Sequence, residues 1–336
     1  MTQVHHLSKR PRKDGMTAIF SGFSVIWIII GVGFAIGRLG MLGPDSRVIM
    51  SRVAFFIASP CLLFLTISDS SIREVLGPQF LIAGMGAFLA LAIFMILGKF
   101  LILRGRSAAE LMVGGLSASL ANSANLGFPI AAYVLGDVSF AAPLVMFQLA
   151  VFTPLYVIVL DFLTRSPTPT SAQVRPSRTV AVLRSIGQSM GNPMIIGSMA
   201  GLLFSWQGWS LPGPIHESVE LLAGASIPLM LLAFGLSLVG SHPLDKKAGR
   251  RRDVLLASAI KLVVHPLAAF GVAVLIFGAS GEMLLAAVVM ASLPSAQNVL
   301  VSAIRYNTGE VIARDTVLVT TVLAIPAMLV VALLLA

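Results

Sequence analysis

The sequence predicts an all-α polytopic membrane protein with ten transmembrane helices, arranged as two inverted repeats of five. Three observations lead to this fold class: the composition, the apolar segments and an internal repeat. The mean hydropathy is +0.94, and only 11% of residues are charged, whereas about a quarter are charged in soluble domains. A helix needs about 20 apolar residues to cross the hydrocarbon core of a bilayer. The apolar segments occupy nearly all of the 336 residues, which leaves no length for a soluble domain.

Segments with the length and hydropathy of a transmembrane helix recur along the whole chain. The fourth and the ninth are the least apolar of them. In order, the ten predicted spans are 18–37, 49–68, 79–103, 111–136, 138–162, 190–210, 219–240, 254–278, 282–304 and 312–336.

The basic residues indicate the topology of the chain. A net charge of +9 is compatible with nucleic-acid binding, but its distribution argues against that function. Nearly all loop Lys and Arg residues follow odd-numbered spans, including the run at 246–252, whereas the even loops contain Arg73 and six acids. Basic residues in short loops stay cytoplasmic. Both termini are therefore predicted outside, and the run at 246–252 is expected to contact anionic lipid.

The N-terminal tail, residues 1–17, departs from this charge rule. Lys9, Arg10, Arg12 and Lys13 lie in it, although the topology places it outside the cell. We hypothesise that translation begins at Met16. Mass spectrometry that detects residues 1–15 in the native protein would contradict this start.

The repeat divides the chain into 18–163 and 190–336, joined by a Ser-, Thr- and Pro-rich linker at 164–189 that is expected to be flexible and cytoplasmic. Segments 119–137 and 292–310 align without a gap. They share a Ser-Leu start, Asn125/Asn298, Tyr133/Tyr306 and Gly136/Gly309. Further correspondences join Gly31 to Gly197, Pro60 to Pro228 and Pro154 to Pro326. Because each repeat has an odd number of spans, the second must enter the membrane from the opposite face.

The aligned segments predict two interrupted helices. Pro129, after Gly127, is expected to break span 4, and Pro294 is expected to break span 9, because proline lacks an N–H and disfavours helical conformation in the preceding residue. A break inside a membrane is tolerated only within protein or beside a water-filled cavity. The N–H groups that it exposes, at the positive end of a half-helix, suit a carboxylate.

Neutral amide side chains surround both predicted breaks. Asn122 and Asn125 lie in the first segment, and Gln297 and Asn298 lie in the second. Gln148 in span 5 is a candidate to extend the polar cavity. The alternative is that these amides only join helices, as polar residues do in membranes. Paired, interrupted segments in the two halves of a chain favour a transporter binding site.

Lys261 and His265, one turn apart in span 8, are the candidates for charge or proton coupling. Lys261 either draws in an anion and exchanges a proton with His265, or it extends to the cytoplasmic surface; the sequence leaves both open. The chain has one cysteine and no His/Glu zinc motif. We therefore expect no catalytic residues, no metal site and no cofactor.

The motifs ANSANLGFPIAAYVLG (121–136), KLVVHPLAAF (261–270) and ASLPSAQNVLVSAIRYN (291–307) resemble the auxin efflux carrier family, including its bacterial malonate and organic-anion permeases, and more distantly the sodium–bile acid symporters. The resemblance implies that spans 4 and 9 are broken and cross near the membrane centre. It implies a scaffold of spans 1, 2, 6 and 7, with spans 3, 4, 5, 8, 9 and 10 moving substrate by an elevator-type motion. It also allows a homodimer. By motif, the crossover residues are Asn122, Asn125, Gly127, Pro129, Pro294, Gln297 and Asn298.

The functional hypothesis is a secondary transporter for a small organic anion, a mono- or dicarboxylate such as malonate, in a bacterial inner membrane. One alternative is sodium-coupled symport of the same substrates. A third hypothesis, a membrane-embedded enzyme, needs a nucleophile–base pair or metal ligands. The sequence shows neither, since His265 is the only histidine within a span.

Overall fold

The computed structural model describes residues 15–43, 45–70, 75–103, 105–164, 191–239, 244 and 248–335. The basic tail before residue 15, nearly all of the linker, and Arg73, Glu74, Arg104, Lys246 and Lys247 lie outside these ranges. Within the described residues the protein is helical, apart from an isolated antiparallel bridge between Ala121 and Ser295. The helices are α1 (Gly15–Arg38), α2 (Ser46–Val53), α3 (Ser59–Ser68), α5 (Pro78–Leu97), α6 (Ala108–Ser119), α7 (Phe128–Ile130), α8 (Ala141–Phe147), α9 (Thr153–Leu163), α11 (Pro193–Gln207), α12 (Gly213–Gly224), α13 (Ser226–Ser237), α14 (Arg251–Ala259), α15 (His265–Leu275), α16 (Gly281–Ala291), α17 (Gln297–Arg305) and α18 (Glu310–Leu335).

Six continuous helical stretches of the described chain are long and apolar enough to cross a membrane, so this is a multi-pass membrane protein. They are Ser46–Ser68, Pro78–Ile102, Val138–Leu163, Gly213–Ser237, Arg251–Leu275 and Glu310–Leu335. Shorter apolar helices cover Ser24–Arg38, Asn125–Leu135 and Gly281–Ala291. The last two belong to the predicted fourth and ninth spans, which are therefore divided.

Prolines within the long stretches are accommodated without ending the helix. Pro60, Pro154 and Pro266 each follow a π-helical turn, at 54–58, 148–152 and 260–264. A proline cannot donate to the carbonyl one turn earlier, and its ring crowds that carbonyl. The wider π turn leaves room for the ring, so the axis continues.

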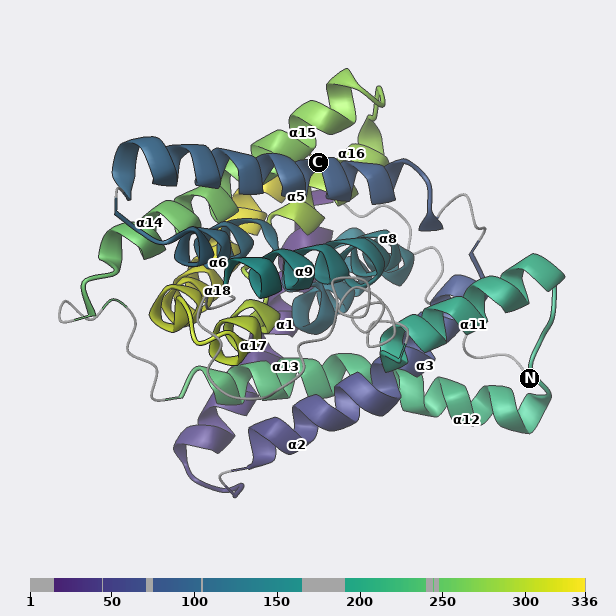
Figure 1. Ribbon diagram of the computed structural model, residues 1–336. Helices are drawn as coiled ribbons and strands as arrows, with labels where there is room; N and C mark the ends of the chain where they lie inside the picture. The colour runs from purple at the N-terminus through teal and green to yellow at the C-terminus, as the bar shows by residue number, and fades with distance from the viewer. Residues whose placement is uncertain are drawn as a thin grey trace, which may run out of the picture.

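One group of helices comprises α1, α2, α3, α11, α12 and α13; all but α1 lie together in the lower half of Figure 1. Helix α1 packs along α13, and α11 packs along α3. Glycines permit both approaches: a Cβ on Gly33 would lie 2.5 Å from the Leu232 carbonyl oxygen, and one on Gly197 would lie 2.5 Å from that of Pro60. Gly33 and Gly37 form a GxxxG motif, a pattern that permits close helix packing in membranes.

The two long helices α2–α3 and α12–α13 meet at a pair of buried serines. The hydroxyl oxygens of Ser59 and Ser226 are 2.9 Å apart. Each serine is the first residue of the second α-helix in its stretch, so similarly placed residues of the two halves contact each other.

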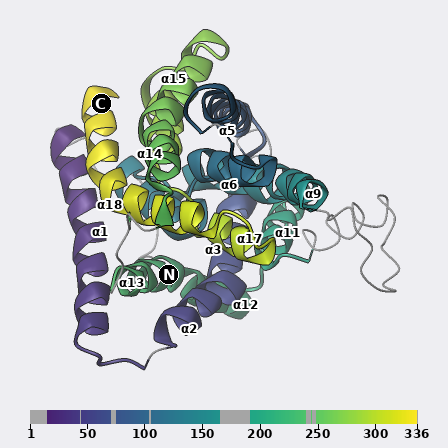
Figure 2. The same ribbon diagram turned by 60° about the vertical axis from the view of Figure 1, so that its left-hand side comes forward.

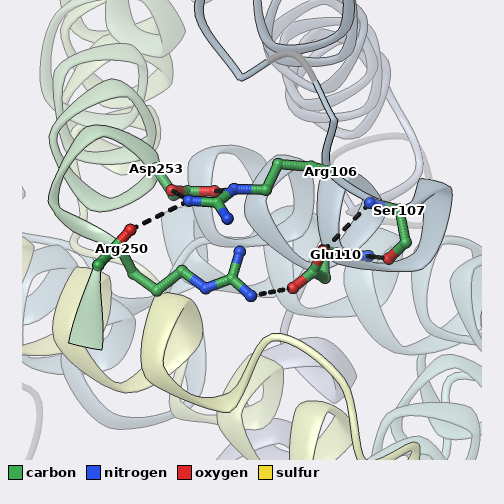
Figure 3. Close-up of polar contacts among 6 residues, drawn as sticks. Arg106, Ser107, Glu110, Arg250 and Asp253 are labelled. Atoms are coloured by element: carbon green, nitrogen blue, oxygen red, sulfur yellow. Dashed lines mark hydrogen bonds and ion pairs between the residues drawn. The ribbon is translucent and has the colours of Figure 1, made fainter. Parts of the chain in front are cut away.

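The second group comprises α5 to α9 and α14 to α18, and α18 lies beside α1 (Figure 2). Two ion pairs fix the start of α6 to the start of α14 (Figure 3). Arg106 binds both carboxylate oxygens of buried Asp253, at 3.0 and 2.9 Å, and Arg250 binds Glu110. Glu110 also completes a capping box with Ser107. Burial raises the pKa of Glu110, but the Ser107 hydrogen bonds and the Arg250 charge outweigh burial and lower it.

Candidate functional site

The two divided helices are interrupted at equivalent places, and the interruptions bind each other. Helix α6 ends at Ser119 and helical backbone resumes at Ser123, while α16 ends at Ala291 and α17 begins at Gln297. The Asn122 N–H donates to the Pro294 carbonyl oxygen at 2.8 Å, and the Ala296 N–H donates to that of Leu120 at 2.9 Å. Each interruption therefore satisfies backbone groups of the other, as buried non-helical backbone requires.

Hydroxyl groups complete this junction. The buried Ser295 hydroxyl donates to the Ser117 carbonyl oxygen near the end of α6. The Ser295 N–H donates to the Thr320 hydroxyl at 3.0 Å, which fixes the second interruption to α18. These contacts join the second interruption to both α6 and α18.

The predicted position of the first break is wrong. Helical backbone runs from Ser123 through Pro129 to Leu135, so Gly127 and Pro129 lie within a continuous helix. A π turn at 123–127 precedes Pro129 and accommodates its ring. The second break is at Pro294, as predicted. In the gapless alignment Leu120 pairs with Leu293, so the observed interruptions coincide although the prolines do not.

A cavity of about 440 Å³ lies beside this junction. Five of the predicted site residues line it: Asn122, Asn125, Gln148, Gln297 and Asn298. Thr153, in the same stretch as Gln148, lines it as well. Gly127, Pro129 and Pro294 are buried and do not line it. Amide-bearing residues of both interruptions therefore border one space.

Asn122 is the most constrained of these amides. It is 2% exposed, and its Oδ1 accepts from the Asn125 N–H at 3.4 Å. Its Nδ2 is buried and has no hydrogen-bond partner in the described structure. Nearby, the Ser123 hydroxyl donates to Gln148 Oε1 at 2.9 Å, which orients that amide toward the same cavity. A buried donor without a partner is uncommon and calls for a functional explanation.

The start of α17 presents further donors to the cavity. Ala296, Gln297 and Asn298 all line it, and no side chain of the described residues caps this helix. The first N–H groups of a helix lack partners within it, and the helix dipole makes this end favourable for an anion. The arrangement fits a carboxylate at the N-terminus of α17.

Two arginines from the other helix group complete the lining. Arg47 and Arg52, on α2, both line the cavity, together with Ser51 and Phe55. In the sequence, such arginines serve only as topology signals, and their place in the cavity lining is seen in the structure. The sequence signal for this position in the cavity lining was the placement of the two arginines at the start of span 2, five residues apart. Guanidinium groups bind carboxylates with paired hydrogen bonds.

Lys261 and His265 lie away from this cavity. Lys261 is fully buried, which excludes the alternative that it extends to the cytoplasmic surface. Its Nζ is 2.7 Å from His265 Nδ1 and 3.0 Å from the Ala291 carbonyl oxygen. Neither residue lines the cavity, so Lys261 does not contact a ligand there directly.

The cavity thus offers amide donors, a helix N-terminus and two guanidinium groups. It has the size of a small-molecule site. In the part of the chain that the structure describes, no three His, Cys, Asp or Glu side chains are grouped to hold a metal ion. The polar groups present are suited to binding a small anion.

Comparison with known proteins indicates a membrane transport protein. The family described as "Membrane transport protein", which includes the auxin efflux carriers, matches residues 19–332. A Rhizobium meliloti (strain 1021) protein named "Putative malonate transporter" is 25% identical over 300 residues, covering 88% of this chain and 89% of the relative. An "Uncharacterized transporter" of Methanocaldococcus jannaschii is 26% identical over 307 residues, covering 88% and 92%. Both relatives are named as transporters.

Proposed function

Because the chain belongs to the membrane transport protein family, we propose that it is a secondary transporter for a small organic anion. The substrate is a mono- or dicarboxylate of about the size of malonate, the compound in the name of the Rhizobium relative. The observation that carries this proposal is the shared cavity. Amide-bearing residues from both interruptions and two arginines of α2 line this cavity of about 440 Å³.

The membrane arrangement in this proposal has ten spans in two inverted repeats, with spans 4 and 9 crossing. Contacts between equivalent residues support it: Ser59 meets Ser226, and residues 120–122 pair with 294–296. The close glycine contacts of α1 with α13 and of α11 with α3 support it as well. A Cβ on Gly31 would meet nothing within 4 Å, so Gly31 itself takes no part in this close packing.

The proposed mechanism is an elevator-type alternation between two states. The arginines that line the cavity belong to the helix group of spans 1, 2, 6 and 7, whereas the amides belong to the other six spans. A rigid movement of the second group would carry the amides and a bound anion away from Arg47 and Arg52. The substrate would then cross the membrane with its amide ligands intact.

The proposed location is a bacterial inner membrane, with odd loops in the cytoplasm and both termini outside. The ion pairs of Arg106 with Asp253 and of Arg250 with Glu110 support this topology, because they join loops 3–4 and 7–8 on one face. Arg47 lies in loop 1–2 and Arg52 lies just after it, and the distribution of basic residues places this loop in the cytoplasm. The cavity would accordingly face the cytoplasm in this conformation.

Binding and transport by purified protein test the proposal. A thermal-shift screen against small carboxylates, malonate first, should raise the unfolding temperature, because a ligand of the native state stabilises it. Proteoliposomes should then take up the carboxylate that binds. Asn125→Ala and Asn298→Ala should each weaken binding about ten-fold or more, as loss of a hydrogen bond to a charged group does.

The surface amide Gln207, which does not line the cavity, provides a matched control, and Gln207→Ala should behave as wild type. Correctly folded Asn125→Ala and Asn298→Ala variants that bind and move substrate like wild type would overturn the site. Failure of every carboxylate to bind or be transported by the wild-type protein would overturn the substrate class.

A further inference from the structure

The cavity at the junction is shared between the two groups of helices. Asn125, Gln297 and Asn298 line it from the second group, around the start of α17. Arg47 and Arg52 line it from α2 in the first group. Helix α2 packs against α13, within its own group. A ligand that contacts both the amides and the arginines therefore bridges two groups of helices.

The two arginines supply the formal charge of this cavity. None of the described residues that line it is an aspartate or a glutamate. Arg47 and Arg52 are both exposed, and neither is ion-paired with a described carboxylate. The ion pairs of the described residues join Arg106 to Asp253, Arg250 to Glu110 and Arg314 to Asp315. Two guanidinium groups are therefore available to a ligand on the α2 side.

The opposite side of the cavity suits one carboxylate rather than two. It offers the first N–H groups of α17 and neutral amides, which bind an anion without a formal positive charge. A second carboxylate placed beside the first would be repelled by it. Guanidinium groups, in contrast, bind a carboxylate with paired hydrogen bonds. The volume of about 440 Å³ leaves room for dicarboxylates longer than malonate.

We propose that Arg47 and Arg52 select dicarboxylates, because they bind the second carboxylate of a substrate whose first carboxylate lies at the start of α17. This inference rests on the proposed function. The first carboxylate moves with the second helix group, so the second must leave the arginines before that group can move. A contact made only before the movement stabilises the starting state and slows the step. A longer dicarboxylate, which reaches further toward α2, is therefore bound more tightly and transported more slowly.

Binding of a diacid and of its monoamide tests the selection. Malonamate and succinamate keep the shapes of malonate and succinate, but a neutral amide replaces one carboxylate. In calorimetric titrations at neutral pH, the wild-type protein should bind each diacid about ten-fold or more tightly than its monoamide. The double variant Arg47→Gln, Arg52→Gln should bind both about equally, whereas Arg47→Lys, Arg52→Lys should keep a preference for the diacid. The matched control is Arg252→Gln, at an exposed arginine outside the cavity lining, and it should keep the full preference.

Uptake by proteoliposomes provides the second readout. Malonate, succinate and glutarate form a series of increasing length with the same charge. Across this series the wild-type protein should show a falling Kd together with a falling maximal rate of uptake. In the Arg47→Gln, Arg52→Gln variant the gain in affinity and the loss of rate should both disappear. A purely structural role of the arginines would not change this dependence on length.

Three results would overturn the inference and leave the proposed function in place. They are wild-type binding of monoamides or monocarboxylates as tight as that of the diacids, a preference for diacids that survives in the folded double variant, and a maximal rate that does not fall with length. Failure of every carboxylate to bind would instead overturn the proposed function. If the double variant cannot be purified folded, the single variants decide. A smaller preference in Arg47→Gln or Arg52→Gln supports the inference, and the full preference in both contradicts it.

Discussion

Asn122 combines a weak structural contact with an unused donor, so its substitution separates binding from stability. Its Oδ1 accepts from the Asn125 N–H at 3.4 Å, near the long limit for a hydrogen bond. Its Nδ2 is buried without a partner in the described structure. The proposed role of that donor is to bind a carboxylate oxygen of the substrate. We therefore expect Asn122→Ala to abolish most binding while leaving the free energy of unfolding nearly unchanged.

Two opposing terms set the expected change in stability. Loss of a helix N-cap costs about 0.5–2 kcal/mol, and the long contact of Asn122 places it in the lower part of this range. Removal of a buried donor without a partner recovers about 1–3 kcal/mol of desolvation penalty. The truncated side chain borders an existing cavity, so no new enclosed void forms. The net effect should lie within about 1 kcal/mol of wild type.

The assay measures the unfolding temperature of purified protein with and without the carboxylate that stabilises wild type. Asn122→Ala should unfold near the wild-type temperature but show a much smaller ligand-induced shift. The matched control is Asn192→Ala. Asn192 caps α11 through a 2.9 Å bond to the Met194 N–H and does not line the cavity. This control should lose about 1 kcal/mol and keep the full ligand shift.

The opposite pattern would refute this reasoning. If Asn122→Ala loses more than about 3 kcal/mol, beyond what an N-cap contributes, and keeps the ligand shift, then Asn122 is a structural residue. The unpartnered donor would then have no part in binding.

Three further predictions concern the framework around the site. Gly197→Ala places a methyl group against a backbone carbonyl of α3 and should destabilise the protein by about 1–3 kcal/mol in a thermal unfolding assay. Gly31→Ala should be neutral in the same assay. Equal effects of the two substitutions would contradict the packing of these helices. A double-mutant cycle of Ser59→Ala and Ser226→Ala should give a coupling energy of about 0.5–1.5 kcal/mol, and additive losses would mean that the hydroxyls do not interact. The lowered pKa of Glu110 implies stability that is present above its unfolded pKa and lost as the pH falls through its folded pKa. Glu110→Gln should therefore be less stable at pH 7, by at most about 1 kcal/mol for a partly exposed pair, and should lose less stability than wild type on acidification; parallel pH curves would refute this.

The alignment of the two repeats predicted the positions of the helix interruptions better than the positions of the prolines did. Matching residues 119–137 to 292–310 places Leu120 opposite Leu293, which is where both interruptions occur. The proline rule placed the first break too late, at Pro129. A proline need not interrupt a helix where the preceding turn widens to accommodate its ring, as the π turn at 123–127 does before Pro129. Helix propensity alone does not show whether a proline breaks a helix or is accommodated by a wider turn.

The charged residues could not be placed from sequence because their surroundings are set by packing between distant helices. Arg47 and Arg52 follow a basic loop, and only the position of α2 across the cavity gives them a ligand-binding role. Lys261 lies in a span whose neighbours are nearly all apolar, so periodicity does not show which face is buried. Its partner on α16, the Ala291 carbonyl, is a backbone atom and leaves no signature in the sequence.

The paired interruptions also constrain how the protein is made. The Asn122 N–H and the Leu120 carbonyl find their partners at Pro294 and Ala296, which are synthesised only after most of the second repeat. Until then, these backbone groups lack their hydrogen-bond partners, and unpaired backbone is strongly disfavoured in lipid. The first half must therefore wait during synthesis, either sheltered by the insertion machinery or as a continuous helix that opens later. The site is thus among the last parts of the molecule to form, and a chain truncated before residue 294 cannot form it.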